Sequence, residues 1–89
     1  MTQPEYDDLW PGGPRFVRSG AGFALGTDSV LLADFAASIA KKKLAIIDLG
    51  TGTGIIPVIL SHKTSAEKIC GVEIQQDSYE RAIRNVRLN

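Results

Sequence analysis

Several features are scarce or missing in this sequence, and their absence limits what the protein can be. There is a single cysteine, Cys70, so the chain can form neither an internal disulfide nor a cysteine-based metal cluster. Ten basic and ten acidic residues cancel, which excludes the strong positive charge typical of nucleic-acid-binding segments. Residues 1–10 are polar and acidic, unlike a secretory signal, and no apolar run is long enough to span a membrane. We therefore expect a soluble, cytoplasmic protein without a metal site.

The sequence that is present divides into two parts. We predict an N-terminal extension over residues 1–26, rich in glycine and proline, and a domain over residues 27–89. In the extension, residues 10–14 predict a turn, and residues 15–17 and 23–25 predict short strands that could form a hairpin with each other. A disordered leader is the alternative interpretation of this extension.

The domain opens with a predicted helix. Thr27 or Asp28 could cap its first turn, because a side-chain oxygen there can accept a hydrogen bond from a free backbone N–H. Apolar residues then recur at helical spacing up to Ala40, and three lysines follow at the end where the helix dipole favours positive charge. A nucleic-acid contact is the alternative role for these lysines.

Two strand–helix units are predicted after this helix. The strand over residues 44–49 is continuously apolar at its start, which indicates burial on both faces as in a parallel sheet. A helix follows from Gly54, then a strand over residues 68–74 and a helix from about Asp77, with Glu80 completing a capping-box pattern. The last helix carries one apolar face, formed by Tyr79, Ala82, Ile83 and Val86. The order hairpin, helix, then β-α-β-α predicts an α/β fold and half of a doubly wound sheet.

The most informative segment is Asp48-Leu-Gly-Thr-Gly-Thr-Gly54, between a predicted strand and a predicted helix. Its three glycines allow unusual backbone angles and a close approach of a ligand to the backbone. The N-terminus of the following helix favours an anionic group. Glu73 ends the next strand, where a carboxylate can accept hydrogen bonds from both hydroxyls of a ribose. The segment predicts a nucleoside site at the carboxyl edge of the sheet.

Two cofactors compete for such a site. A dinucleotide site usually has the pattern G-x-G-x-x-G, whereas here Ile55 stands at the position of the last glycine. Asp48 would repel a pyrophosphate, but it could pair with the ammonium group of S-adenosyl-L-methionine. Glycine spacing and Asp48 both favour S-adenosyl-L-methionine. A tight turn without a ligand and a dinucleotide site are the alternatives.

These residues resemble the motifs of a known superfamily. Asp48-Leu-Gly-Thr-Gly-Thr-Gly54 is similar to motif I of class I S-adenosylmethionine-dependent methyltransferases, and Gly71-Val-Glu-Ile74 is similar to the acidic end of their second strand. The block from Gly22 to Phe35 and the ending Arg-Asn-Val-Arg-Leu-Asn89 resemble bacterial tRNA (adenine-N6)-methyltransferases that act on valine tRNA. The resemblance extends from about residue 12 to the end of the chain.

The resemblance implies a Rossmann-like class I methyltransferase fold, of which this chain holds the N-terminal portion, and tRNA as the substrate. Related families methylate ribosomal RNA bases or glutamine side chains, and these acceptors are the alternatives. The methionine part of the donor would lie over residues 50–54, its ribose would be held by Glu73, and Thr27 and Asp28 would line the methionine end. The cofactor-binding residues that we predict are Thr27, Asp28, Asp48, Gly50, Thr51, Gly52, Gly54 and Glu73.

One family feature has no counterpart here. Family members carry an Asn-Pro-Pro-Tyr-type motif that holds the target amino group, whereas the prolines of this chain stand at positions 4, 11, 14 and 57. We therefore expect no catalytic residue and no methyltransferase activity from this chain alone, because holding the acceptor in line with the methyl group is most of the catalysis. The alternative is a non-catalytic interaction module, or a module that associates with itself through an open sheet edge.

Overall fold

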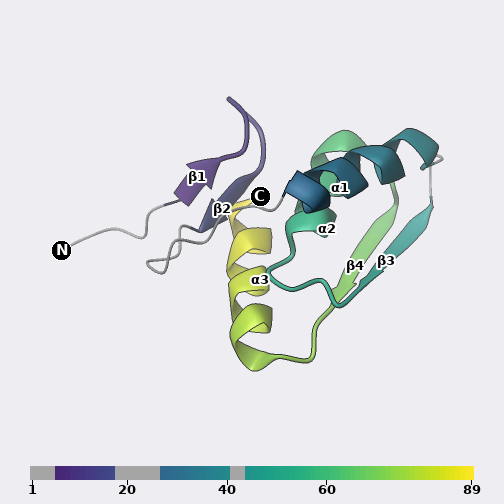
Figure 1. Ribbon diagram of the computed structural model, residues 1–89. Coiled ribbons are helices and arrows are strands. Elements are labelled where there is room, and N and C mark those ends of the chain that lie inside the picture. The colour runs from purple at the N-terminus through teal and green to yellow at the C-terminus, as the bar shows by residue number, and fades with distance from the viewer. Residues whose placement is uncertain (1–5, 18–26, 41–43) are drawn as a thin grey trace.

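The computed structural model describes residues 6–17, 27–40 and 44–89 (Figure 1). The strand predicted at residues 23–25 and the lysines at 41–43 lie outside these residues. Within these residues, three helices and four strands form a small α/β structure; the elements from residue 15 onward follow in the predicted order, and a strand that we did not predict precedes them. In chain order they are β1 (Tyr6–Asp8), β2 (Arg15–Val17), α1 (Thr27–Ile39), β3 (Ala45–Leu49), α2 (Ile55–Lys63), β4 (Lys68–Val72) and α3 (Gln76–Leu88).

The N-terminal hairpin joins β2 to an upstream partner. β1 and β2 pair antiparallel, and the predicted turn at residues 10–14 connects them, with Gly13 N donating to Trp10 O at 2.8 Å. The turn folds the chain back through Gly12, whose φ of 75° lies in the left-handed region. Our prediction that residues 15–17 pair with residues 23–25 missed this partner, because the sequence of β1, Tyr-Asp-Asp, has no strand pattern of its own.

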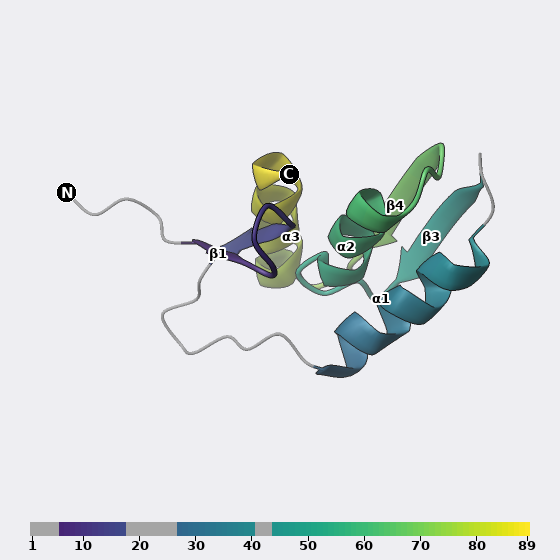
Figure 2. The ribbon, with the colours of Figure 1, turned by 90° about the horizontal axis from the view of Figure 1, so that it is seen from above.

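β3 and β4 form a parallel two-stranded sheet in which Ala45 lies opposite Lys68 and Leu49 lies opposite Val72. We predicted that both faces of this sheet would be buried, and the structure contradicts this within the described residues. Ile46 is half-buried, whereas Ile47 and Leu49 on the opposite face are 66% and 78% exposed. Figure 2 shows the reason: the helices lie on one side of this sheet.

The hydrophobic core lies where the hairpin, α1 and α2 meet. Phe16 of β2, Ala33 of α1, and Val58 and Ile59 of α2 are buried together. The centre of α2 is apolar all round, and each of its residues from Pro57 to Leu60 is buried, as expected for a helix enclosed by neighbours. α2 lies between α1 and α3 (Figure 2). None of the helices in the described part of the chain has the length and apolar character of a membrane-spanning segment.

Two predicted helix caps are wrong. Thr27 is the first residue of α1 and Asp28 lies in its first turn, so neither precedes the helix as a cap. α3 begins at Gln76, and Gln75 before it makes no side-chain capping bond, so the capping box of Asp77 and Glu80 is absent. Both carboxylates at 28 and 77 still stand in first turns, where the helix dipole favours negative charge.

The apolar face predicted on α3 is only partly covered. Ala82 is buried and Ile83 is half-buried, but Tyr79 and Val86 are 48% and 55% exposed. The most deeply buried side chain of this helix is instead a polar one, Asn85, which is 2% exposed.

Candidate functional site

The glycine loop, residues 50–54, connects the carboxyl end of β3 to the N-terminus of α2. Gly50, Gly52 and Gly54 have φ angles of 70°, 61° and 79°, which side chains with a Cβ rarely adopt. The predicted unusual backbone angles are therefore confirmed. Gly50 N and Thr51 N both donate to the carbonyl oxygen of Val72 at 2.9 Å, which fixes the start of the loop to the end of β4.

Small residues let this loop pack closely against its neighbours. A Cβ added at Gly54 would lie 3.3 Å from the Cβ of Ala82 on α3, and one added at Gly71 would lie 2.7 Å from the Thr51 side chain. Gly71 thus shapes the loop although we did not predict it as a site residue. Among the described atoms, nothing lies within 4 Å of a Cβ added at Gly50 or Gly52, so a ligand could approach the backbone there.

Glu73 lies directly after β4 and turns back to the glycine loop. Its Oε1 accepts a hydrogen bond from Gly52 N at 2.7 Å, and its Oε2 accepts one from Gln75 N at 2.9 Å. These N–H groups, first that of Gln75 and then that of Gly52, hold the pKa of Glu73 below its ordinary value. The site therefore contains a half-buried carboxylate that is ionised at neutral pH and sits at the predicted edge of the sheet.

A small cavity adjoins this carboxylate. It has a volume of about 110 Å³, and Thr51, Gly71 and Glu73 line it on one side, with Tyr79 and Ile83 of α3 on the other. Small-molecule sites usually enclose ~300–1,000 Å³, so the described residues form only part of the enclosure that a nucleoside would need. Within these residues, the buried hydroxyl oxygens of Thr51 and Thr53 have no hydrogen-bond partner, which leaves polar capacity unused in the loop.

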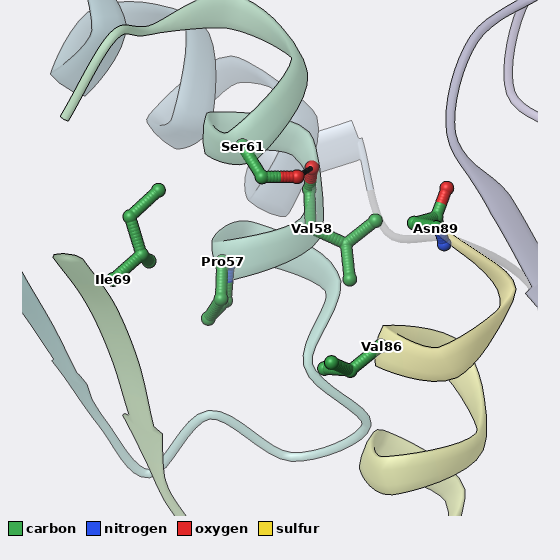
Figure 3. A pocket seen from close by; sticks show the side chains of 6 residues that line it. All are labelled: Pro57, Val58, Ser61, Ile69, Val86 and Asn89. Carbon is green, nitrogen blue, oxygen red and sulfur yellow. Dashed lines mark hydrogen bonds between the residues drawn. The ribbon is translucent and has the colours of Figure 1, made fainter. Parts of the chain in front are cut away.

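A larger cavity of about 260 Å³ lies between α2, β4 and α3 (Figure 3). None of the predicted cofactor-binding residues lines it, so we assign the candidate site to the smaller cavity beside Glu73. The residues that line the larger cavity are Pro57, Val58, Ser61, Ile69, Val86 and Asn89.

Three predicted cofactor-binding residues stand outside the glycine loop and Glu73, namely Asp48, Thr27 and Asp28. Asp48 is half-buried in β3 and pairs in register with Gly71 of β4, close to the start of the loop. Thr27 and Asp28 are exposed in the first turn of α1. In the described part of the chain, no hydrogen bond links either of them to Glu73 or to the loop. The structure thus brings together the loop, Asp48 and Glu73, but does not join Thr27 and Asp28 to them.

Asn85 also contacts the glycine loop, although it was not among the predicted site residues. The Nδ2 group of this buried side chain donates to the carbonyl oxygen of Thr53, in the glycine loop, at 2.9 Å. The available signal was an asparagine within the apolar pattern of α3, four residues before a second asparagine, Asn89. We read only the apolar face of this helix, and a polar residue on the packed side gives no periodic signal.

Comparison with known proteins adds a family assignment to this geometry. The family model for ribosomal protein L11 methyltransferase (PrmA) matches residues 17–89. The tRNA1(Val) (adenine(37)-N6)-methyltransferases of Flavobacterium johnsoniae and Christiangramia forsetii are 44% and 41% identical to this chain over 61 residues. These matches cover 68% of the chain but only 26% and 25% of the two relatives.

A ribosomal protein methyltransferase matches more of the chain at lower identity. The ribosomal protein L11 methyltransferase of Lactobacillus gasseri is 32% identical over 94 aligned residues, which cover 97% of this chain and 29% of that protein. The chain therefore spans about a quarter of the length of the curated relatives that it matches.

Proposed function

Because this chain belongs to the methyltransferase family whose model matches residues 17–89, we propose that its glycine loop and Glu73 bind S-adenosyl-L-methionine. The observation that carries the proposal is the hydrogen bond of 2.7 Å between Gly52 N and the Glu73 carboxylate. It puts an ionised acceptor beside a loop whose backbone is open to a ligand, at the carboxyl edge of parallel strands, where ligands bind in α/β sheets.

Each part of the cofactor has a matching group in this proposal. The ribose hydroxyls donate to Glu73, whose two oxygens each have a further lone pair. The methionine part lies over residues 50–54, including Thr51, and its ammonium group pairs with Asp48. Thr27 and Asp28 line the methionine end in the same proposal, which requires the first turn of α1 to face the loop. The cofactor, once bound, supplies a methyl group on a sulfonium ion.

We propose a Rossmann-like fold for the cofactor-binding part, residues 27–89, with residues 1–26 as an N-terminal extension. We also propose that the whole protein methylates N6 of an adenine in tRNA, and therefore acts in the cytoplasm. The identities of 44% and 41% to tRNA1(Val) methyltransferases support this acceptor over the ribosomal protein, whose methyltransferase is 32% identical. The 89 residues alone would not transfer the methyl group, because they contain no Asn-Pro-Pro-Tyr-type motif for the acceptor.

Calorimetric titration with S-adenosylhomocysteine tests the donor site. We expect the wild-type chain to bind and the Glu73→Gln variant to bind at least tenfold more weakly, because a charged acceptor is replaced by a neutral amide. Glu80→Gln is the matched control, since it removes an exposed carboxylate of α3 that lies outside the lining of the site. A folded wild-type chain that does not bind, or binds NAD in preference, would contradict the proposal.

A second candidate function is self-association through the β3–β4 sheet. Ile47, Leu49 and Val72 form an exposed apolar face, and exposed apolar surface of this kind often marks a contact site. If the sheet mediates association, light scattering will show a dimer, and Leu49→Lys will convert it to a monomer. A wild-type monomer at high concentration would rule out this candidate.

A further inference from the structure

Asn85 of α3 and Asn89, the residue that follows this helix, cover the open edge of strand β2. Asn89 Oδ1 accepts from Arg15 N at 2.9 Å, and Asn89 Nδ2 donates to Arg15 O at 2.8 Å. One turn earlier, Asn85 Oδ1 accepts from Val17 N at 2.8 Å. These backbone groups lie on the edge of β2 that faces away from β1. The two side-chain amides thus take the place of a neighbouring strand and satisfy backbone groups that would otherwise need another partner.

Asn85 has a second contact that Asn89 does not share. Its Nδ2 donates to the carbonyl oxygen of Thr53 at 2.9 Å, so one buried side chain holds both β2 and the glycine loop. Thr53 lies between Gly52, which donates to Glu73, and Gly54, which packs against Ala82. The oxygen and the nitrogen of the Asn85 amide are therefore both hydrogen-bonded. Thr53, to which the nitrogen donates, stands between the two glycines that contact Glu73 and Ala82.

We propose that Asn85 is a positioning residue of the donor site. By holding the Thr53 carbonyl, it keeps the Gly52 N–H directed at Glu73 and keeps the loop open to the cofactor. It also ties the loop to β2, so that docking of the N-terminal hairpin and donor binding depend on the same side chain. This inference rests on the proposed function, because it assumes that the loop binds the donor.

Asn85→Ala and Asn89→Ala form a matched pair that separates loop contact from strand contact. We expect Asn85→Ala to weaken S-adenosylhomocysteine binding by about tenfold. The variant lacks the hydrogen bond to the Thr53 carbonyl oxygen, so the loop must be ordered when the ligand binds. Asn89→Ala removes the contacts of this side chain with Arg15, His62 and the Asn85 carbonyl oxygen, but none with the glycine loop, and it should leave the affinity within about twofold of wild type. Equal losses in the two variants, or no loss in either, would overturn the inference.

Hairpin docking has its own reporter in Trp10, the single tryptophan. Its ring lies on the hairpin and makes an edge-on contact with His62 of α2, at 6.5 Å between ring centroids. The fluorescence of Trp10 should change in Asn89→Ala. It should stay as in wild type in Asn85→Asp, which keeps the acceptor for Val17 N but loses the donor for Thr53 O. The same Asn85→Asp variant should lose binding, and retained wild-type affinity would contradict loop positioning.

Amide NMR spectra distinguish a failure of this inference from a failure of the proposed function. In the ligand-free chain, the resonances of Gly52 and Gly54 should shift in Asn85→Ala and stay in place in Asn89→Ala. Unshifted loop resonances in a wild-type chain that binds would overturn the inference alone, whereas a wild-type chain that does not bind would overturn the proposed function. If the Asn85 variants do not fold, the inference is tested on the wild-type chain. The side-chain amide resonances of Asn85 should shift on titration with S-adenosylhomocysteine, and unchanged resonances would overturn the inference.

Discussion

The two faces of the β3–β4 sheet carry similar residues in very different surroundings. Ile46 and Ile69 share the face on the side of the helices and are half-buried. Ile47 and Leu49 alternate with Ile46 along the same strand, yet both are largely exposed. Residue type therefore does not decide burial in this sheet. What decides it is whether a helix covers the face, and the helices lie on one side only (Figure 2).

The largest effect that sharpens this comparison should come from a matched pair of isoleucines. Ile59, in the helix beside the covered face, is 0% exposed, and Ile59→Ala should lower the free energy of unfolding by about 2–5 kcal/mol. Ile47→Ala on the open face should cost about 1 kcal/mol or less, which reflects only strand preference. Urea denaturation of both variants measures the difference. Similar losses would mean that the open face is buried in solution.

The second largest loss of stability should come from substitutions in the glycine loop, which follows β3. Gly50→Ala should cost about 1–2 kcal/mol, because alanine is strained at a left-handed φ. Gly54→Ala should cost more, because the added methyl group must also displace Ala82. The same denaturation experiment compares the two variants. A smaller loss at Gly54 than at Gly50 would show that the loop does not pack against α3 as described.

The contribution of Glu73 to stability should depend on pH. The pKa of Glu73 is lowered from 4.5 on folding, so the carboxylate stabilises the folded state above about that pH. This contribution should disappear as the pH falls through the lowered value. We expect the stability difference between wild type and Glu73→Gln to shrink between neutral and acidic pH. Thermal melts across this range are the measurement, and a constant difference would contradict the Glu73 hydrogen bonds.

The smallest effect should come from the ion pair between α1 and α2. Lys63 Nζ lies 2.8 Å from Asp34 Oδ1, but the two side chains are 33% and 66% exposed. Asp34→Asn should therefore lower stability by less than about 1 kcal/mol, and added salt should remove the difference. A loss comparable to that of Ile59→Ala would mean that this surface contact carries far more of the structure than its exposure indicates.

Local patterns were sufficient to predict much of the fold and of the candidate site. The strand before the glycine loop, the left-handed glycines, Pro57 in the first turn of α2 and the place of Glu73 follow from short segments of sequence. Each depends on properties of neighbouring residues, such as spacing, chain direction or the missing Cβ of glycine. The caps at Asp28 and Asp77 failed because helix ends shift by one or two residues without any change in pattern.

The sequence by itself therefore determined the order of the elements from β2 onward and the chemistry gathered at the glycine loop. Only the tertiary structure decided which face of the sheet is covered, which strand pairs with β2, and that Asn85 joins this strand to the loop. The physical reason is distance along the chain: Asn85 and Val17 are 68 residues apart, and Asn89 and Arg15 are 74 residues apart. Contacts of that range depend on which surfaces meet once the helices have packed, and no local pattern records them.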